Sequence, residues 1–151
     1  MAGKLAAKLK KIKLFVLDVD GVMTDGSIIL GSDGTEYKAF NVKDGSGISI
    51  ARYAGMKFAI LSGRYSKVID TRAEELKIDA VYQNVLIKAE VYEDIKDKFC
   101  LKDEEICFVG DEIIDIPVMN KCGFSSAPGV GALAFIRSFC PSDARLQSTT
   151  A

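Results

Sequence analysis

The chain has 151 residues, with a hydrophobic fraction of 48% and a charged fraction of 27%, which are ordinary values for a globular protein with a sizeable core. Its formal net charge of -1 argues against a nucleic-acid partner, and no apolar stretch reaches the length of a transmembrane helix. The chain has no histidine, which excludes a Ser-His-Asp triad, a Cys-His pair, a His-ligated zinc site and a phosphohistidine mechanism.

A lysine-rich segment, residues 1–12, leads into the rest of the chain. We interpret it as a soluble lead-in rather than a helix on a membrane surface, and not as a removable signal peptide, because the strand that follows belongs to the core. The cysteines lie in or beside apolar stretches and lack C-x-x-C spacing, which indicates reduced thiols in a cytoplasmic protein. They are Cys100, Cys107, Cys122 and Cys140.

Residues 14–17 (LFVL) are consecutively apolar and predict a strand that is buried on both faces of a parallel sheet. The run ends at Asp18, and Asp20 follows two residues later, so both carboxylates can project to the same side of an extended chain. Two carboxylates this close are costly unless a cation lies between them or they share a proton. In isolation, Asp-x-Asp-Gly fits a solvated turn as well as a functional site.

A β-hairpin flap is predicted next, where it interrupts the step from strand to helix. Residues 28–30 and 37–42 are its expected strands, on either side of a Ser-Asp-Gly turn. The following helix is expected to be capped by Asp44 or Ser46 and to end at Gly55. Its predicted apolar stripe consists of Ile48, Ile50, Ala51 and Ala54.

Strands and helices alternate along the rest of the chain. Pro117 is expected to kink its helix or to mark a first turn, and residues 140–151 are polar and aperiodic, as in a frayed tail. Short connections between alternating elements predict one α/β domain over residues 1–151, with a Rossmann-like, mostly parallel sheet. The predicted strands are 57–61, 79–82, 105–109 and 123–126, and the predicted helices are 66–76, 87–99, 113–120 and 130–139.

Polar signatures follow three of the predicted strands. In a parallel sheet the carboxyl ends of the strands meet at one edge, where ligands bind. Asp111 can therefore join Asp18 and Asp20 around one ion, and an all-oxygen site of this kind suits Mg²⁺. The signatures are Asp18-x-Asp20-Gly21, Ser62-Gly63-Arg64 and Gly110-Asp111-Glu112-x-x-Asp115.

The same edge carries groups that suit phosphoryl transfer. Ser62 and the neighbouring backbone N–H groups offer donors to phosphoryl oxygens, and Lys88, at the start of a predicted helix, supplies positive charge. Taken singly, Ser62 fits a strand-end turn, whereas Lys88 and Asp115 fit solvated helix residues. Taken together, their positions after the strands favour a Mg²⁺-dependent phosphoryl-transfer site.

Four motifs resemble those of the haloacid dehalogenase superfamily of aspartyl phosphatases: DVDGVMTD, LSGR, Lys88 and GDEIID. The hairpin followed by KAFNVKDGSGI, without an inserted cap domain, resembles the small capless branch that contains the 3-deoxy-D-manno-octulosonate 8-phosphate phosphatases. The match covers residues 11–128. It implies a three-layer sandwich, Mg²⁺ as cofactor, and hydrolysis of an acidic sugar phosphate, the octulosonate 8-phosphate first, in the cytoplasm as part of lipopolysaccharide biosynthesis.

The resemblance also implies roles for the acidic residues. Asp18 would be the nucleophile that becomes an aspartyl phosphate, and a metal ligand together with Asp111. Asp20 would be the general acid to the leaving oxygen and then the base for water, with its backbone carbonyl on the metal. Lys88 would bind the phosphoryl group during catalysis. The loop around these residues would be supported by Asp115 and Glu112.

For substrate binding, the resemblance implies that Ser62 holds the phosphoryl group with Gly63 and Arg64 beside it. In the family the hairpins help to assemble a homotetramer, with active sites at the subunit junctions. Lys43 and Asp44 would then lie near the substrate.

Several features depart from the family pattern. Glu112 and Ile114 stand where the family more often has Asp and Asn, and the glycine-rich, arginine-bearing tail of the family is not recognisable after Pro128. The segment from Gly129 to Ala134 superficially fits a dinucleotide fingerprint, but no long strand precedes it and no acidic residue follows at the required distance, so we reject that interpretation.

Two other interpretations remain open. One is a related phosphatase that acts on a sialic-acid-type nonulosonate 9-phosphate. The other is a non-catalytic, phosphatase-like module for oligomerisation or regulation, against which the intact Asp18 and Asp20 argue.

Overall fold

The apolar runs of the sequence form a five-stranded sheet in the computed structural model, which describes residues 2–128. The strand order is β5-β4-β1-β6-β7, and every neighbouring pair is parallel, as the alternation of elements predicts. The predicted helix at 130–139 and the predicted tail at 140–151 lie outside the described residues. The strands are β1 (Leu14–Leu17), β4 (Lys57–Leu61), β5 (Ala80–Tyr82), β6 (Ile106–Val109) and β7 (Phe124–Ser126).

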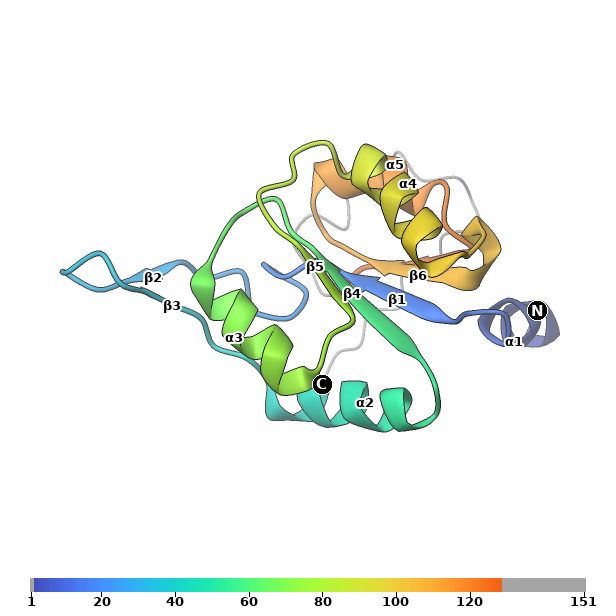
Figure 1. Cartoon of the computed structure of the whole chain (residues 1–151), viewed down its shortest axis with the longest axis horizontal. Coiled ribbons are helices and arrows are strands. Elements are labelled where there is room, and N and C mark those ends of the chain that lie inside the picture. Colours follow the sequence, from blue (N-terminus) through green and yellow to red (C-terminus); the bar gives the residue numbers. More distant parts are fainter. Residues whose placement is uncertain (1, 129–151) are drawn as a thin grey trace.

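Helices cover both faces of this sheet and give the predicted three layers (Figure 1). The side chains of β1 alternate between two hydrophobic clusters: Leu14 and Val16 belong to one, and Leu17 belongs to the other. This alternation explains why the run LFVL is apolar throughout, and no cap domain is present among residues 2–128. The first cluster includes residues of α4 (Lys88–Phe99) and α5 (Ile116–Met119), and the second those of α2 (Val42–Tyr53) and α3 (Lys67–Leu76).

The register of the central strands brings three loops to one edge of the sheet. Leu17 in β1 lies opposite Ile60 in β4 and Val109 in β6. The chain leaves β1 at Asp18, whose backbone N–H donates to the carbonyl of Val109 at 2.9 Å. The three polar signatures therefore meet at the carboxyl edge, where ligands bind in open α/β sheets.

The flap is shorter than predicted. Its strands β2 (Ile29–Leu30) and β3 (Glu36–Tyr37) pair in antiparallel fashion and project from the body of the molecule (Figure 1). The prediction of a strand over 37–42 is wrong for most of that range, because Asn41 caps α2. The side-chain oxygen of Asn41 accepts a hydrogen bond from the backbone N–H of Lys43 at 2.8 Å, which satisfies a free donor of the first turn.

Helix α2 consequently starts before its predicted caps, Asp44 and Ser46, which lie inside its first turns. The predicted apolar stripe is also too wide. Ile48 is buried, whereas Ile50 is 70% exposed and Ala54 is exposed. Residues two positions apart on a helix point about 200° apart, so Ile48 and Ile50 cannot share one face.

The other predicted elements are confirmed to within one residue at each end, apart from the helix over 113–120. That segment divides into a 3₁₀ turn (Ile113–Asp115) and α5, with Pro117 in the first turn of α5, where its missing N–H has no partner to lose. The lysine-rich lead-in forms α1 (Ala2–Leu9), and a second 3₁₀ turn (Asp103–Glu105) precedes β6. None of the helices within 2–128 has the length and hydropathy required to cross a membrane.

Candidate active site

Asp18 lies at the centre of the carboxyl edge, directly after β1. It is 2% exposed, and its Oδ1 accepts a hydrogen bond from the backbone N–H of Val19 at 2.7 Å. Its other oxygen, Oδ2, lies 2.8 Å from Nζ of Lys88. A fixed, buried carboxylate with one oxygen held by the backbone and the other beside a cation has the orientation that a nucleophile requires.

Lys88 is the first residue of α4 and is buried between two carboxylates. Its Nζ lies 2.6 Å from Oδ1 of Asp115 in addition to its contact with Asp18. Burial lowers the pKa of Lys88, but the charges of Asp18 and Asp115 outweigh that effect and raise the pKa overall. A lysine in the first turn of a helix opposes the helix dipole, and the two carboxylates compensate for this placement.

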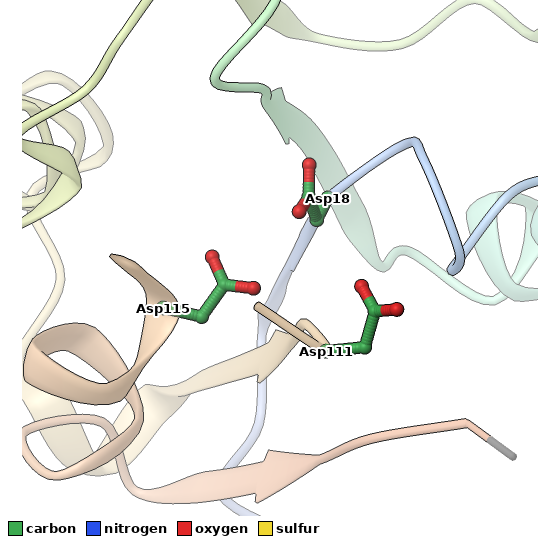
Figure 2. Close-up of side chains that lie close together, drawn as sticks. All are labelled: Asp18, Asp111 and Asp115. Carbon is green, nitrogen blue, oxygen red and sulfur yellow. The ribbon is translucent and has the colours of Figure 1, made fainter. Parts of the chain in front are cut away.

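A third carboxylate, that of Asp111, completes a cluster with Asp18 and Asp115. Each of the three residues offers one oxygen, and these oxygens lie within 4.8 Å of one another. Figure 2 shows the three side chains converging from the end of β1, from the loop after β6 and from the 3₁₀ turn. Asp115 is held in place by the backbone N–H of Glu112, which donates to its Oδ2 at 2.9 Å. We call these three residues and Lys88 the inner cluster.

The loop after β1 approaches this cluster closely at Gly21. Its φ of +83° is in the left-handed region, and a Cβ at this position would overlap the carboxylate of Asp111. Both the backbone conformation and the space require a glycine here. The glycine therefore sets the distance between the first and fourth motifs.

Burial raises the pKa of Asp18 and of Asp111 in the inner cluster. The pKa of Asp18 increases to about 7 because burial outweighs the opposing effect of Lys88, and Asp115 adds to the increase. Burial, together with the charges of Asp115 and Glu112, raises the pKa of Asp111 to about 6. Both groups would be ionised more readily next to a bound cation.

The inner cluster fits a magnesium ion. Oδ1 of Asp111 is buried and accepts no hydrogen bond from the described residues, so its lone pairs are free for a cation. Lys88 neutralises only part of the charge of three carboxylates, and all the available donors are oxygens, which Mg²⁺ prefers. Asp18 and Asp111 can hold such an ion.

The carboxylate of Asp20 lies outside the inner cluster and belongs to a ring of ion pairs. Lys38 pairs with its Oδ1, and Nη1 of Arg64 lies 3.4 Å from its Oδ2. Glu36 closes the ring, since its Oε1 lies 3.5 Å from Nζ of Lys38 and 3.0 Å from Nη2 of Arg64. We call these four residues the outer ring. The backbone carbonyl of Asp20 as a metal ligand stays a prediction.

The comparisons with known proteins agree with this geometry, although no family model matches the chain. Over 127 residues it is 41% identical to the 3-deoxy-D-manno-octulosonate 8-phosphate phosphatase KdsC of Escherichia coli strain K12, which covers 84% of this chain and 68% of that protein. The chain belongs to this phosphatase family. It is an enzyme of the haloacid dehalogenase type, as the four motifs predict.

Solved structures extend this likeness to three dimensions. The Moraxella catarrhalis 3-deoxy-D-manno-octulosonate 8-phosphate phosphatase, crystallised with magnesium, phosphate and KDO, is 35% identical with a TM-score of 0.83, over 87% of this chain and 75% of that one. A probable YrbI family phosphatase of Pseudomonas syringae is also 35% identical, with a TM-score of 0.87 over 97% and 82% of the two chains. Magnesium as the cofactor of the family is consistent with the inner cluster.

The other predicted site residues of this phosphatase differ in how far they are buried. Ser62 is 1% exposed at the end of β4, and its Oγ accepts a hydrogen bond from the backbone N–H of Arg64 at 3.4 Å. A Cβ at Gly63 would come within 3.1 Å of the side chain of Ile114, so no larger residue fits easily there. Lys43 and Asp44 are exposed in the first turn of α2 and form no ion pair with the described residues.

Two residues of the outer ring, Glu36 and Lys38, were not predicted from the sequence. Both lie at the end of the flap, and the two-residue spacing between them was the available signal, because it places both side chains on one side of an extended chain. Their partners, Asp20 and Arg64, come from other loops. The spacing alone does not reveal those partners.

Proposed function

We propose that this chain hydrolyses 3-deoxy-D-manno-octulosonate 8-phosphate, an acidic sugar phosphate, through an aspartyl phosphate formed on Asp18. The observation that carries the proposal is the buried Asp18 carboxylate, oriented by the backbone of Val19 and by Lys88 within reach of two further carboxylates. The family relationship supports the same activity.

In the first step a carboxylate oxygen of Asp18 attacks phosphorus, and the bond between phosphorus and the sugar oxygen breaks. Lys88 lies beside the attacking group, where its ammonium stabilises the negative charge of the phosphoryl oxygens. Ser62, buried at the end of the neighbouring strand, donates a hydrogen bond to the same oxygens. Asp20, which must be in its protonated form at this step, gives its proton to the departing sugar oxygen.

In the second step water attacks the phosphorus of the aspartyl phosphate. Asp20 takes the proton of this water, the bond between phosphorus and Asp18 breaks, and inorganic phosphate leaves. Asp18, Asp111 and the backbone carbonyl of Asp20 would hold Mg²⁺, which neutralises phosphoryl charge when bound. Asp115, held by the backbone of Glu112, orients Lys88 throughout.

Arg64, Gly63, Lys43 and Asp44 would contact the sugar part of the substrate. Arg64 is 44% exposed and so can reach a ligand at the mouth of the site. The relative from Moraxella catarrhalis holds a KDO molecule together with phosphate and magnesium, which supports an acidic octulosonate as substrate here.

We further propose one domain over residues 1–151 that assembles as a homotetramer through the flap and acts in the cytoplasm. Apolar side chains on the flap are largely exposed in the single chain, and exposed apolar patches mark interaction sites. Free cysteines among the described residues support a reducing compartment. The exposed flap residues are Ile28, Ile29, Leu30 and Tyr37, and their replacement by serine should shift the mass measured by light scattering from tetramer to smaller species.

The activity is tested by phosphate release from a panel of sugar phosphates with and without Mg²⁺, including the octulosonate 8-phosphate and a nonulosonate 9-phosphate. We expect selective, metal-dependent release from the octulosonate ester and loss of release in Asp18→Asn. Preference for the nonulosonate ester would show that the proposed substrate is wrong and would leave the proposed mechanism in place. No release from folded wild-type protein with Mg²⁺ would favour the non-catalytic module.

A further inference from the structure

The outer ring holds both oxygens of Asp20, one with each cation. Its two cations differ in burial: the side chain of Lys38 is 1% exposed, whereas that of Arg64 is 44% exposed. An exposed ion pair is weak and easily exchanged for another partner, but a buried ammonium must keep its carboxylate partners. Arg64 can therefore turn to a ligand while Lys38 stays in place.

The position of Lys38 is itself fixed by the flap. Glu36 and Lys38 lie two residues apart on an extended chain, so both side chains point to the side of the flap that faces Asp20. Glu36 forms ion pairs with both cations of the ring, which keeps the ammonium of Lys38 between two carboxylates. Within the part of the chain that the structure describes, Lys38 contacts no residue of the inner cluster by an ion pair.

We propose that Lys38 is a positioning residue that fixes the carboxyl group of Asp20 relative to Asp18. This inference rests on the proposed function, in which Asp20 transfers the proton to the leaving oxygen. Asp20 follows Asp18 by two residues, but its side chain has rotational freedom that the backbone does not remove. Lys38 removes that freedom from one oxygen and leaves the other, which only the exposed Arg64 holds, available to the reacting ester.

The competing explanation is that Lys38 only fastens the flap to the body. The two roles differ in their dependence on the leaving group. A sugar alkoxide is a poor leaving group and needs a well-placed acid, whereas p-nitrophenolate leaves without one. A fastening role would affect the two esters alike, because both enter the same site.

The test compares wild-type protein with Lys38→Met on the octulosonate 8-phosphate and on p-nitrophenyl phosphate, with Mg²⁺ present. The ratio kcat/KM covers the steps up to formation of the aspartyl phosphate, so it includes the proton transfer to the leaving group and excludes the later hydrolysis of the intermediate. We expect a loss of about 10²-fold on the sugar ester and less than about 5-fold on the aryl ester. The inhibition constant of the free octulosonate should stay within about 3-fold of wild type, since the side chain of Lys38 is buried against Asp20.

Lys57→Met is the matched control. Lys57 is exposed, pairs with Asp79, and lies at the start of β4, at the end of the strand away from the candidate active site. This variant should have the wild-type kcat/KM on both esters. A thermal unfolding curve for each variant shows that the protein tested is folded at the assay temperature.

Equal losses on the two esters, or no loss on either, in a folded Lys38→Met variant would overturn the positioning role while wild-type turnover upholds the proposed function. Absence of phosphate release by the wild-type protein from both esters would instead overturn the proposed function, and the role of Lys38 with it.

Discussion

The inner cluster and the outer ring are both networks of carboxylates and cations, but they differ in burial and in origin. In the inner cluster the side chains of Asp18, Lys88 and Asp115 are at most 2% exposed. In the outer ring only Lys38 is buried to this degree, and the two carboxylates are 17% and 18% exposed. The inner cluster also has more negative charge than Lys88 can neutralise, whereas the outer ring is balanced.

This difference indicates two purposes. A buried group with excess negative charge is stable only with a bound cation or proton, so it is suited to hold a metal ion and a phosphoryl group. A charge-balanced ring is stable without a metal ion, and its exposed member, Arg64, can exchange its partner without a large cost while Lys38 stays in place. In the proposed mechanism, the residues that bind phosphate are therefore separate from those that place Asp20.

The largest effect is expected for Asp18→Asn, which removes the proposed nucleophile but keeps the shape of the side chain. Phosphate release should decrease by about 10⁴-fold or more, because the amide cannot form the covalent intermediate. Its thermal stability should remain close to wild type, since a buried charge is lost with its burial cost. Persistent phosphate release in a purified variant would show that the aspartyl-phosphate mechanism is wrong.

The two networks should differ in how much the free energy of unfolding decreases when the buried lysine of each is replaced by methionine. Lys88→Met leaves two buried carboxylates without a cation, so we expect the free energy of unfolding in the absence of metal to decrease by about 3–5 kcal/mol. Lys38→Met should cost about 1–3 kcal/mol, because Asp20 keeps Arg64 and some contact with water. Urea unfolding at neutral pH measures both.

The control for this pair is Lys121→Met, whose lysine forms an ion pair with Glu93 and is 49% exposed. It should change the free energy of unfolding by at most about 1 kcal/mol. If Lys88→Met cost no more than this surface variant, the inner cluster would not depend on its cation.

Two glycines with the same φ of +83° provide the next comparison, since Gly21 lies against Asp111 and Gly34 lies at the open tip of the flap. Gly34→Ala should cost only the backbone strain, about 1 kcal/mol. Gly21→Ala should cost this amount and also displace Asp111, with a loss of phosphate release of about 10-fold or more. Similar phosphate release in the two variants would show that Asp111 tolerates displacement.

The smallest expected effect is that of pH on stability. The pKa shifts of the carboxyl groups have opposite signs in the two networks. The pKa values of Asp18 and Asp111 are raised, so the folded protein binds more protons than the unfolded chain, and metal-free stability should decrease as pH increases from about 4 to about 7. The pKa of Glu36 is lowered by a hydrogen bond from Ser66 and by the charges of Lys38 and Arg64. The stability that ionised Glu36 contributes is therefore lost only as the pH falls through this lowered pKa.

The corresponding measurement is the Tm in EDTA at pH 5.5 and pH 8. We expect a Tm lower by about 3–5 °C at pH 8, and a larger increase on adding Mg²⁺ at pH 8 than at pH 5.5, because the ion replaces the protons. A Tm that increases with pH in EDTA would contradict the raised pKa values.

The sequence predicted that Asp18 and Asp111 lie close together, because both directly follow buried strands. It also placed the carboxylate of Asp20 around the same ion, whereas the structure pairs that carboxylate with Lys38 and Arg64. Once the apolar runs predict a parallel sheet, Asp18 and Asp111 must lie at one edge, and Lys88 needs only to start the helix that packs beside them. The outer ring depends on how the flap folds back on the body, which no local pattern determines. Lys38 was therefore missed, although its partner Asp20 was identified.

A local competition for backbone hydrogen bonds explains the error in the flap. The alternation in residues 37–42 fits a strand, but Asn41 competes for the backbone N–H groups of the following residues and begins α2 instead. Ile50 was placed on the apolar stripe because it is hydrophobic, yet it lies on the exposed side of the helix. Exposed apolar residues are common on protein surfaces and carry little information about packing.

The all-parallel sheet also has a consequence for how the chain reaches its folded state. β1 pairs with β4 and β6, which both lie far from it along the chain. Neither pairing can therefore form early by closing a short loop. Contacts of long sequence separation slow folding, because chain entropy is lost before they form. Asp18, Lys88 and Asp115 meet only after these late contacts are made. Recovery of phosphate release after dilution from denaturant should therefore lag behind recovery of helical circular dichroism.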